Sequence, residues 1–288
     1  MSTILLGSVA SASVFLGLPF GRLHRAFVHR KGFFNGAAGG ILLYLLLDLL
    51  GHARERPWEV ISAARSGAAT WPQAIALILI FAGGLAAGWL VAVVVQQLWG
   101  DARWIRARAT TAGREPGLPE REQNLLTNLL IALSVGLYNF LQGMAIGQAG
   151  RWTVQATLIG GIGLLLLGFV LHNAVKGFAI VAPLIGAGMP VAWRYLLALG
   201  VVASLPTLPG LILGISYWNP FLFVGFFTTA AGTTLFTLRE LLFREPLLQQ
   251  HRGAVGGVAV GFLVAVIVTL VLEINQYSLP ELMSSFWL

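Results

Sequence analysis

Eight stretches of the 288-residue chain are long and apolar enough to be read as membrane-spanning helices. A helix needs about 20 apolar residues to cross the hydrocarbon core of a bilayer, within a range of roughly 17–25. The runs lie at 4–20, 33–50, 74–98, 124–149, 154–184, 193–216, 221–238 and 254–272. Only 10% of the residues are charged, against roughly 25% in a soluble domain. The sequence therefore predicts an all-α membrane protein, with residues 1–288 forming a single transmembrane domain. Because no charge precedes Arg22, we expect the first run to be a retained span rather than a cleaved signal peptide.

The basic residues are unevenly divided between the two sets of loops. Four lie after the even-numbered runs, and thirteen lie after the odd-numbered ones: Arg22, Arg25, Arg30, Lys31, Arg103, Arg106, Arg108, Arg114, Arg121, Arg194, Arg239, Arg244 and Arg252. Positively charged loops stay in the cytoplasm. Residues 100–123 are therefore predicted to be a cytoplasmic loop, and both termini to lie outside the cytoplasm, in a plasma membrane such as a bacterial inner membrane. The net charge of +7 is accounted for by these loops, so the expected partner is the lipid bilayer and not a nucleic acid. A homodimer stays open.

Two pairs of segments resemble each other within the chain. Residues 33–39 read Phe-Phe-Asn-Gly-Ala-Ala-Gly, and residues 226–232 read Phe-Phe-Thr-Thr-Ala-Ala-Gly. Residues 138–146 and 172–180 share the pattern x-Asn-x-x-x-Gly-x-Ala-Ile. In each pair the two copies run in opposite directions across the membrane. Inverted repeats with a polar site at their interface are typical of secondary transporters, although chance similarity and small-residue packing seams are the alternatives.

Six polar side chains gather on the second of these pairs. Residues three and four apart share one face of a helix. This spacing places Tyr138, Asn139 and Gln142 on one face of the run 124–149, and His172, Asn173 and Lys176 on the matching face of the run 154–184. Polar and ionisable groups within a membrane are costly and usually face the bundle interior. We therefore expect an internal polar site between these two helices, with hydrogen bonding between helices as the alternative for Tyr138, Asn139 and Gln142.

These motifs resemble those of the ZIP (zinc/iron-regulated transporter-like) family of divalent-metal transporters. In that family the fourth helix typically reads His-Asn-x-Pro-Glu-Gly, and the fifth has a His followed four residues later by Glu. The resemblance covers nearly the whole chain and implies eight helices in a 3+2+3 bundle with inverted repeats. It also implies a metal path through the fourth and fifth helices, for zinc, iron, manganese or cobalt as the transported ion.

The chain departs from the ZIP pattern at several matched positions. Asn139, Gly143 and His172 fit, whereas Tyr138 replaces His, Gln142 replaces Glu and Lys176 replaces Glu. The resemblance implies His172, Asn139, Asn173 and Gln142 as metal ligands, and Thr207 at about the place of an acid in the sixth helix. Tyr138 and Asp48 complete the implied path.

The substitutions change the charge of the expected site. Two carboxylates are lost and one ammonium is gained, while zinc and iron prefer imidazole and carboxylate ligands. A divalent cation beside protonated Lys176 would be repelled, unless the lysine loses its proton, which burial favours. Asp48 is the acid inside a predicted span, so we expect Lys176 to pair with it and to take the place of a bound cation.

The sequence is compatible with two functions and argues against a third. The first is a ZIP-like transporter of divalent cations with an atypical site. The second is a protein of the same fold that has lost metal transport and acts as a regulatory or structural membrane protein, or carries another solute. The third is an intramembrane enzyme, which is not expected because the sequence has no His-Glu-x-x-His or Gly-x-Ser-x-Gly motif and no pair of membrane aspartates.

Overall fold

The computed structural model describes residues 3–22, 31–108, 120–149, 161–186, 191–217, 219–243 and 251–285. Every element in these ranges is helical. The long helices are α3 (Lys31–Arg65), α4 (Trp71–Arg108), α5 (Glu120–Ala149), α6 (Gly161–Gly186), α9 (Pro220–Phe243) and α10 (His251–Ser285). The prediction of an all-α protein is confirmed for the part of the chain that the structure describes.

Two of the expected spans are interrupted. The first is built from α1 (Thr3–Ala12) and two 3-10 segments, η1 (Ser13–Leu16) and η2 (Leu18–Arg22). The sixth is divided into α7 (Trp193–Ser204) and α8 (Thr207–Ser216). Pro206 stands at this second break, where it has no N–H to donate to a preceding carbonyl, so the regular helical ladder is interrupted.

Several helices extend beyond the apolar runs that predicted them. α3 continues to Arg65 through a charged segment that includes the ion pair between Arg56 and Glu59, at 2.7 Å. α4 continues to Arg108, so the predicted loop 100–123 begins with helix. Hydropathy defines the part of a helix that fits the bilayer and not the end of the helix, which explains both differences. Residues 154–160 of the fifth predicted run lie outside the described residues.

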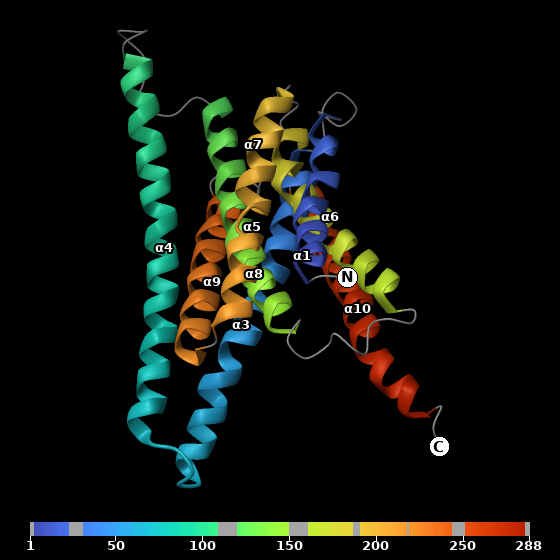
Figure 1. Ribbon diagram of the computed structural model, residues 1–288. Coiled ribbons are helices and arrows are strands. Elements are labelled where there is room, and N and C mark those ends of the chain that lie inside the picture. Colours follow the sequence, from blue (N-terminus) through green and yellow to red (C-terminus); the bar gives the residue numbers. More distant parts are fainter. Residues whose placement is uncertain are drawn as a thin grey trace.

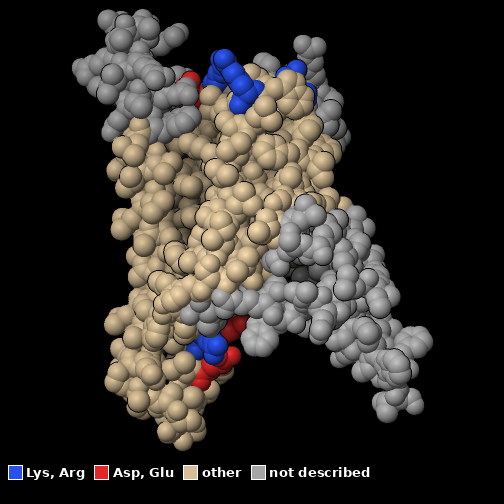
Figure 2. All heavy atoms as spheres, in the orientation of Figure 1, with Lys and Arg blue, Asp and Glu red and all other residues tan. Residues whose placement is uncertain are grey.

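Six helices in the described ranges are long and apolar enough to cross a membrane: Gly32–Arg65, Trp71–Leu98, Arg121–Met144, Trp193–Ser216, Pro220–Leu242 and Gly253–Leu270. Val170–Ile185 in α6 is a shorter apolar helix. Figure 2 shows the coloured charged side chains near the two ends of the molecule, with a band of other residues between them. This distribution is that of an integral membrane protein.

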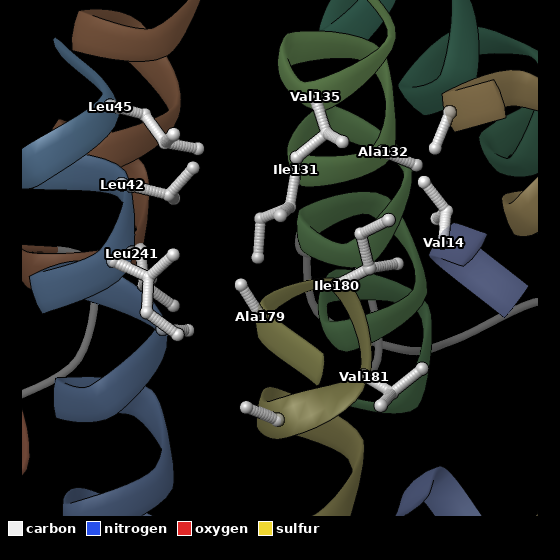
Figure 3. Packing of buried hydrophobic residues seen from close by; sticks show 14 of the residues in the cluster. Val14, Leu42, Leu45, Ile131, Ala132, Val135, Ala179, Ile180, Val181 and Leu241 are labelled. Carbon is white, nitrogen blue, oxygen red and sulfur yellow. The ribbon is translucent and has the colours of Figure 1, made fainter. Parts of the chain in front are cut away.

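The helices run side by side, with α4 at the edge of the bundle (Figure 1). α3 packs along α10, α9 and α6, and α4 packs mainly along α9. The core lies between α3, α5 and α6, where Leu42 and Leu45 point toward Ile131 (Figure 3). The polar residues described below lie within this same group of helices.

Glycine contacts hold α5 and α6 against their neighbours in the same way. A Cβ atom at Gly143 on α5 would lie 2.1 Å from the carbonyl oxygen of Thr207 on α8. A Cβ atom at Gly177 on α6 would lie 2.1 Å from the carbonyl oxygen of Val14 in η1. The reciprocal contacts are those of Gly210 with the Phe140 carbonyl and of Gly17 with the Ala174 carbonyl. Backbones approach this closely only where small residues allow it. Gly143 and Gly177 are the glycines shared by the two copies of the motif.

Candidate functional site

The matched polar residues of α5 and α6 meet around one ammonium group. The Nζ atom of Lys176 donates hydrogen bonds to Asn139 Oδ1 at 2.9 Å, to Gln142 Oε1 at 3.0 Å and to Asn173 Oδ1 at 3.0 Å. We call these three oxygens the amide cage. Asn139 and Asn173 occupy equivalent positions in the two motifs, as do Gln142 and Lys176, so the motif pairing predicted from the sequence is also a contact in space.

The three oxygens of the cage match the donors of a charged lysine. An ammonium has three N–H donors and no acceptor, whereas a neutral amine would turn its lone pair toward one of the oxygens. The orientation of one amide is fixed independently, because Asn139 Nδ2 donates to the carbonyl of Ala203 at 2.9 Å, which turns Oδ1 toward Lys176. The Lys176 residue is only 1% exposed, so the ammonium depends on these bonds in place of water.

Tyr138 covers a further side of the ammonium. Lys176 Nζ lies 3.9 Å from the centre of the Tyr138 ring, within the range of a cation–π interaction. The hydroxyl of the same tyrosine donates to Asp48 Oδ2 at 2.6 Å. Among the contacts of the described residues, none joins Lys176 directly to the Asp48 carboxylate. The expected pairing of Lys176 with Asp48 is therefore not a direct hydrogen-bonded contact among the described residues; Tyr138 contacts both, Lys176 with its ring and Asp48 with its hydroxyl.

Asp48 lies where α3 changes from apolar to charged sequence. Its side chain is 14% exposed, and His52, one turn further along α3, has a side chain that is 50% exposed. His52 Nδ1 lies 3.7 Å from Asp48 Oδ1 and 2.9 Å from the Asp48 carbonyl oxygen. Arg54 and Glu55 follow and are exposed. The Asp48–Tyr138 contact thus connects the buried cage to the end of the bundle that carries the turn between α3 and α4.

His172 lies beside this group but outside the amide cage. Its ring centre is 5.9 Å from that of Tyr138, which occupies the equivalent position in the other motif. Its Nδ1 shares a hydrogen bond 3.2 Å long with Thr269 Oγ1 on α10. Of the four residues implied as metal ligands, Asn139, Asn173 and Gln142 converge on Lys176, and His172 is bonded elsewhere.

Three buried polar atoms have no hydrogen-bond partner among the described residues: Asn35 Oδ1, Asn128 Oδ1 and Thr207 Oγ1. Thr207 was predicted as a site residue, and it is held near the motif of α5 by the contact between its carbonyl and Gly143. Asn128 was not predicted. It lies eleven residues, or about three helical turns, before Asn139, and its Nδ2 donates to the carbonyl of Ile180 on α6. Periodicity along α5 was the signal that could have identified it.

The donor set differs from that of a zinc or iron site. The described residues include no group of three or more His, Asp or Glu side chains that could hold a metal ion. The amide cage provides neutral oxygens, and the Asp48 carboxylate accepts a hydrogen bond from Tyr138. Such a set lacks the anionic ligands that would compensate a divalent charge, whereas it satisfies a monovalent ammonium.

No protein-family model and no curated protein matches this chain.

Proposed function

We propose that this protein is a ZIP-like integral membrane transporter in which the ammonium of Lys176 takes the place of a bound divalent cation. The observation that carries this proposal is the set of three amide hydrogen bonds, 2.9–3.0 Å long, that fills the coordination of Lys176 Nζ. A positive charge that is already held at the centre of the site repels a second cation. The solute that the protein moves is therefore not a divalent metal bound in this cage.

The glycine contacts support the eight-helix, inverted-repeat arrangement included in this proposal. Val14 and Gly17, three residues apart, contact α6, and Thr207 and Gly210, also three residues apart, contact α5. A second correspondence involves α3 and α9, the helices that carry the Phe-Phe/Ala-Ala-Gly pair. α10 meets α3 through Gly257 and Gly261, and α4 meets α9 through Gly84 and Gly88. A two-fold relation between the segments before α5 and those after α6 accounts for both correspondences. The excess of basic residues in the loops after the odd-numbered runs places the α3–α4 turn and both termini of this arrangement outside the cytoplasm.

Divalent-metal transport is the second candidate, and one observation favours it. The buried imidazole of His172 lies on α6, which carries one copy of the motif. The hydroxyl of Thr207, which has no hydrogen-bond partner among the described residues, lies on α8, which packs against α5. They could add to the amide oxygens if Lys176 left the cage during the transport cycle.

Uptake into proteoliposomes separates the two candidates. We would measure radioactive zinc, iron, manganese and cobalt with the wild type and with the double variant Gln142→Glu/Lys176→Glu, which restores the two acids of the ZIP pattern. The matched control is Gln142→Leu/Lys176→Met, which removes the cation without adding acids. We expect no uptake by the wild type or the control, and uptake by the acidic variant.

Two other results would contradict the first candidate. Wild-type uptake that is lost on His172→Ala would establish the second candidate and contradict the first. Inactivity of every variant, in protein shown to be folded, would favour a ZIP-like protein that has lost transport and acts as a structural or regulatory membrane protein.

A further inference from the structure

The amide cage and the Tyr138 ring together match one chemical group. Three acceptor oxygens lie at hydrogen-bond distance from Nζ, and an aromatic face covers another side of it. A primary ammonium presents three N–H donors and one positive charge, which these four contacts satisfy. We propose that the cage is a receptor for primary ammonium groups, and that primary alkylammonium cations are the solute class it accepts when Lys176 vacates it. This inference rests on the proposed function, since it requires Lys176 to be a resident cation.

Other cations fit the same contacts less well. A divalent cation needs anionic ligands, and the carboxylate of Asp48 is bonded to the hydroxyl of Tyr138. A quaternary ammonium could contact the ring, but it has no N–H to donate and would leave the three amide oxygens without a donor. The donor count therefore selects a primary ammonium over both of these classes.

Part of the receptor is held in place without the lysine. Asn139 is fixed by its hydrogen bond to the Ala203 carbonyl, and the Tyr138 ring is fixed by its hydrogen bond to Asp48. Neither bond involves Lys176. An acceptor oxygen and the aromatic face should therefore stay oriented toward the vacated position, which lowers the cost of binding a free ligand.

The titratable groups that surround the cage are few. Tyr138 faces the cage from α5. Asp48, which accepts the hydrogen bond of Tyr138, and His52 both lie on α3, and His172 lies on α6, the helix that carries Lys176. Residues 3–21, and residues 253–270 of α10, contain no titratable side chain. A comparison of ligands with the same charge and different numbers of N–H donors therefore tests the cage directly.

The test shortens the lysine side chain and supplies the removed atoms as a free ligand. Lys176→Ala removes three methylene groups and the ammonium, which together correspond to n-propylammonium. The melting temperature of purified Lys176→Ala would be measured in n-propylammonium chloride and in tetramethylammonium chloride at equal ionic strength. Lys176→Met is the matched control, because its side chain fills the space that Lys176→Ala leaves empty.

A ligand that binds the folded state raises its stability in proportion to the logarithm of its concentration above the dissociation constant. We expect n-propylammonium to recover about half or more of the melting temperature lost by Lys176→Ala, and tetramethylammonium to recover little. Lys176→Met should gain nothing from either salt. The proposed receptor would be contradicted if the two salts changed the melting temperature of Lys176→Ala equally. It would also be contradicted if n-propylammonium raised the melting temperature of Lys176→Met as much as that of Lys176→Ala.

Extraction provides a second measurement if Lys176→Ala does not survive purification alone. Membranes that contain the variant would be solubilised in each of the two salts. Folded protein recovered only with n-propylammonium supports the receptor, whereas equal recovery, or no recovery in either salt, contradicts it.

Failure of the receptor can be separated from failure of the proposed function. Lys31 and Lys176 are the two lysines of the chain, so Lys31→Arg protein labelled with 15N at lysine Nζ gives one side-chain signal, that of Lys176. A neutral amine in this spectrum, or divalent-metal uptake by the wild type, would refute the proposed function. An ammonium signal, together with an n-propylammonium effect no larger than that of tetramethylammonium, would refute only the receptor.

Discussion

The ammonium of Lys176 lies 3.9 Å from the centre of the Tyr138 ring, and the hydroxyl of that tyrosine donates to Asp48 at 2.6 Å. Tyr138 thereby contacts the buried cation with its ring face and the carboxylate through its hydroxyl. Tyr138→Phe keeps the ring and removes the hydroxyl. Because hydrogen bonds to charged groups contribute about 1.5–3 kcal/mol, we expect Tyr138→Phe to lower the free energy of unfolding by an amount in this range, measured by denaturant titration in detergent.

A double-mutant cycle isolates this bond from other effects. Asp48→Leu removes the acceptor and Tyr138→Phe removes the donor, so each single change eliminates the bond. Adding Asp48→Leu to Tyr138→Phe should then cost less stability than Asp48→Leu costs in the wild type. Strict additivity of the two losses would contradict the contact.

The amide cage predicts unequal roles for two of its members. Asn139 is buried and bonds both Lys176 and the Ala203 carbonyl, whereas Gln142 is partly buried and bonds only Lys176 among its identified partners. Asn139→Leu and Gln142→Met preserve approximate volume. The first should be less stable than the second by about 1–3 kcal/mol, because it also leaves the buried carbonyl of Ala203 without its side-chain donor. Thermal unfolding of both proteins, with Thr269→Val as a control outside the cage, checks this order.

The sequence predicted the α5–α6 part of the site well because its information is local. Helical spacing placed Asn139 with Gln142 and Asn173 with Lys176, and the match between the two motifs indicated that the faces pair. The structure brings all four together. The apolar runs likewise located the helices, because burial in lipid requires a continuous apolar sequence.

Contacts between distant helices were not encoded in a local pattern. The sequence led us to expect a pairing of Asp48 with Lys176, but the position of the Tyr138 ring, which contacts Lys176 while its hydroxyl contacts Asp48, depends on the relative rotation of α3, α5 and α6. The bond between His172 and Thr269 joins residues of α6 and α10 that share no motif. The helical ends beyond the bilayer, such as residues 53–65 of α3, were missed because hydropathy does not report on exposed helix.

Close backbone packing at the two motif glycines leads to a stability prediction. A Cβ atom at Gly143 or Gly177 would lie 2.1 Å from a backbone carbonyl oxygen, whereas Gly83 on α4 has no atom within 4 Å of such a Cβ. Overpacking costs about 1–3 kcal/mol, so we expect Gly143→Ala and Gly177→Ala to be destabilised by similar amounts.

The matched control for these glycines is Gly83→Ala. Alanine is favoured over glycine in a helix interior by about 0.5–1 kcal/mol, so this variant should unfold at the same temperature as the wild type or slightly above it. Thermal unfolding of the three variants in one detergent provides the comparison. A stable Gly143→Ala beside an unstable Gly177→Ala would contradict the equivalent packing of α5 and α6.

The direction of the chain across the membrane can be tested because the sequence contains no cysteine. The excess of arginine in the segment 100–123 predicts that this segment is cytoplasmic, and that the α3–α4 turn, with Gly67 and Ala68, lies outside. Single cysteines would be introduced as Ala68→Cys and Ala112→Cys, and intact cells would be treated with a membrane-impermeant maleimide. Ala68→Cys should react in intact cells, and Ala112→Cys only after permeabilisation. The reverse pattern would place Asp48 and His52 toward the cytoplasmic end of the bundle, whereas labelling of both positions in intact cells would contradict a membrane crossing by α4.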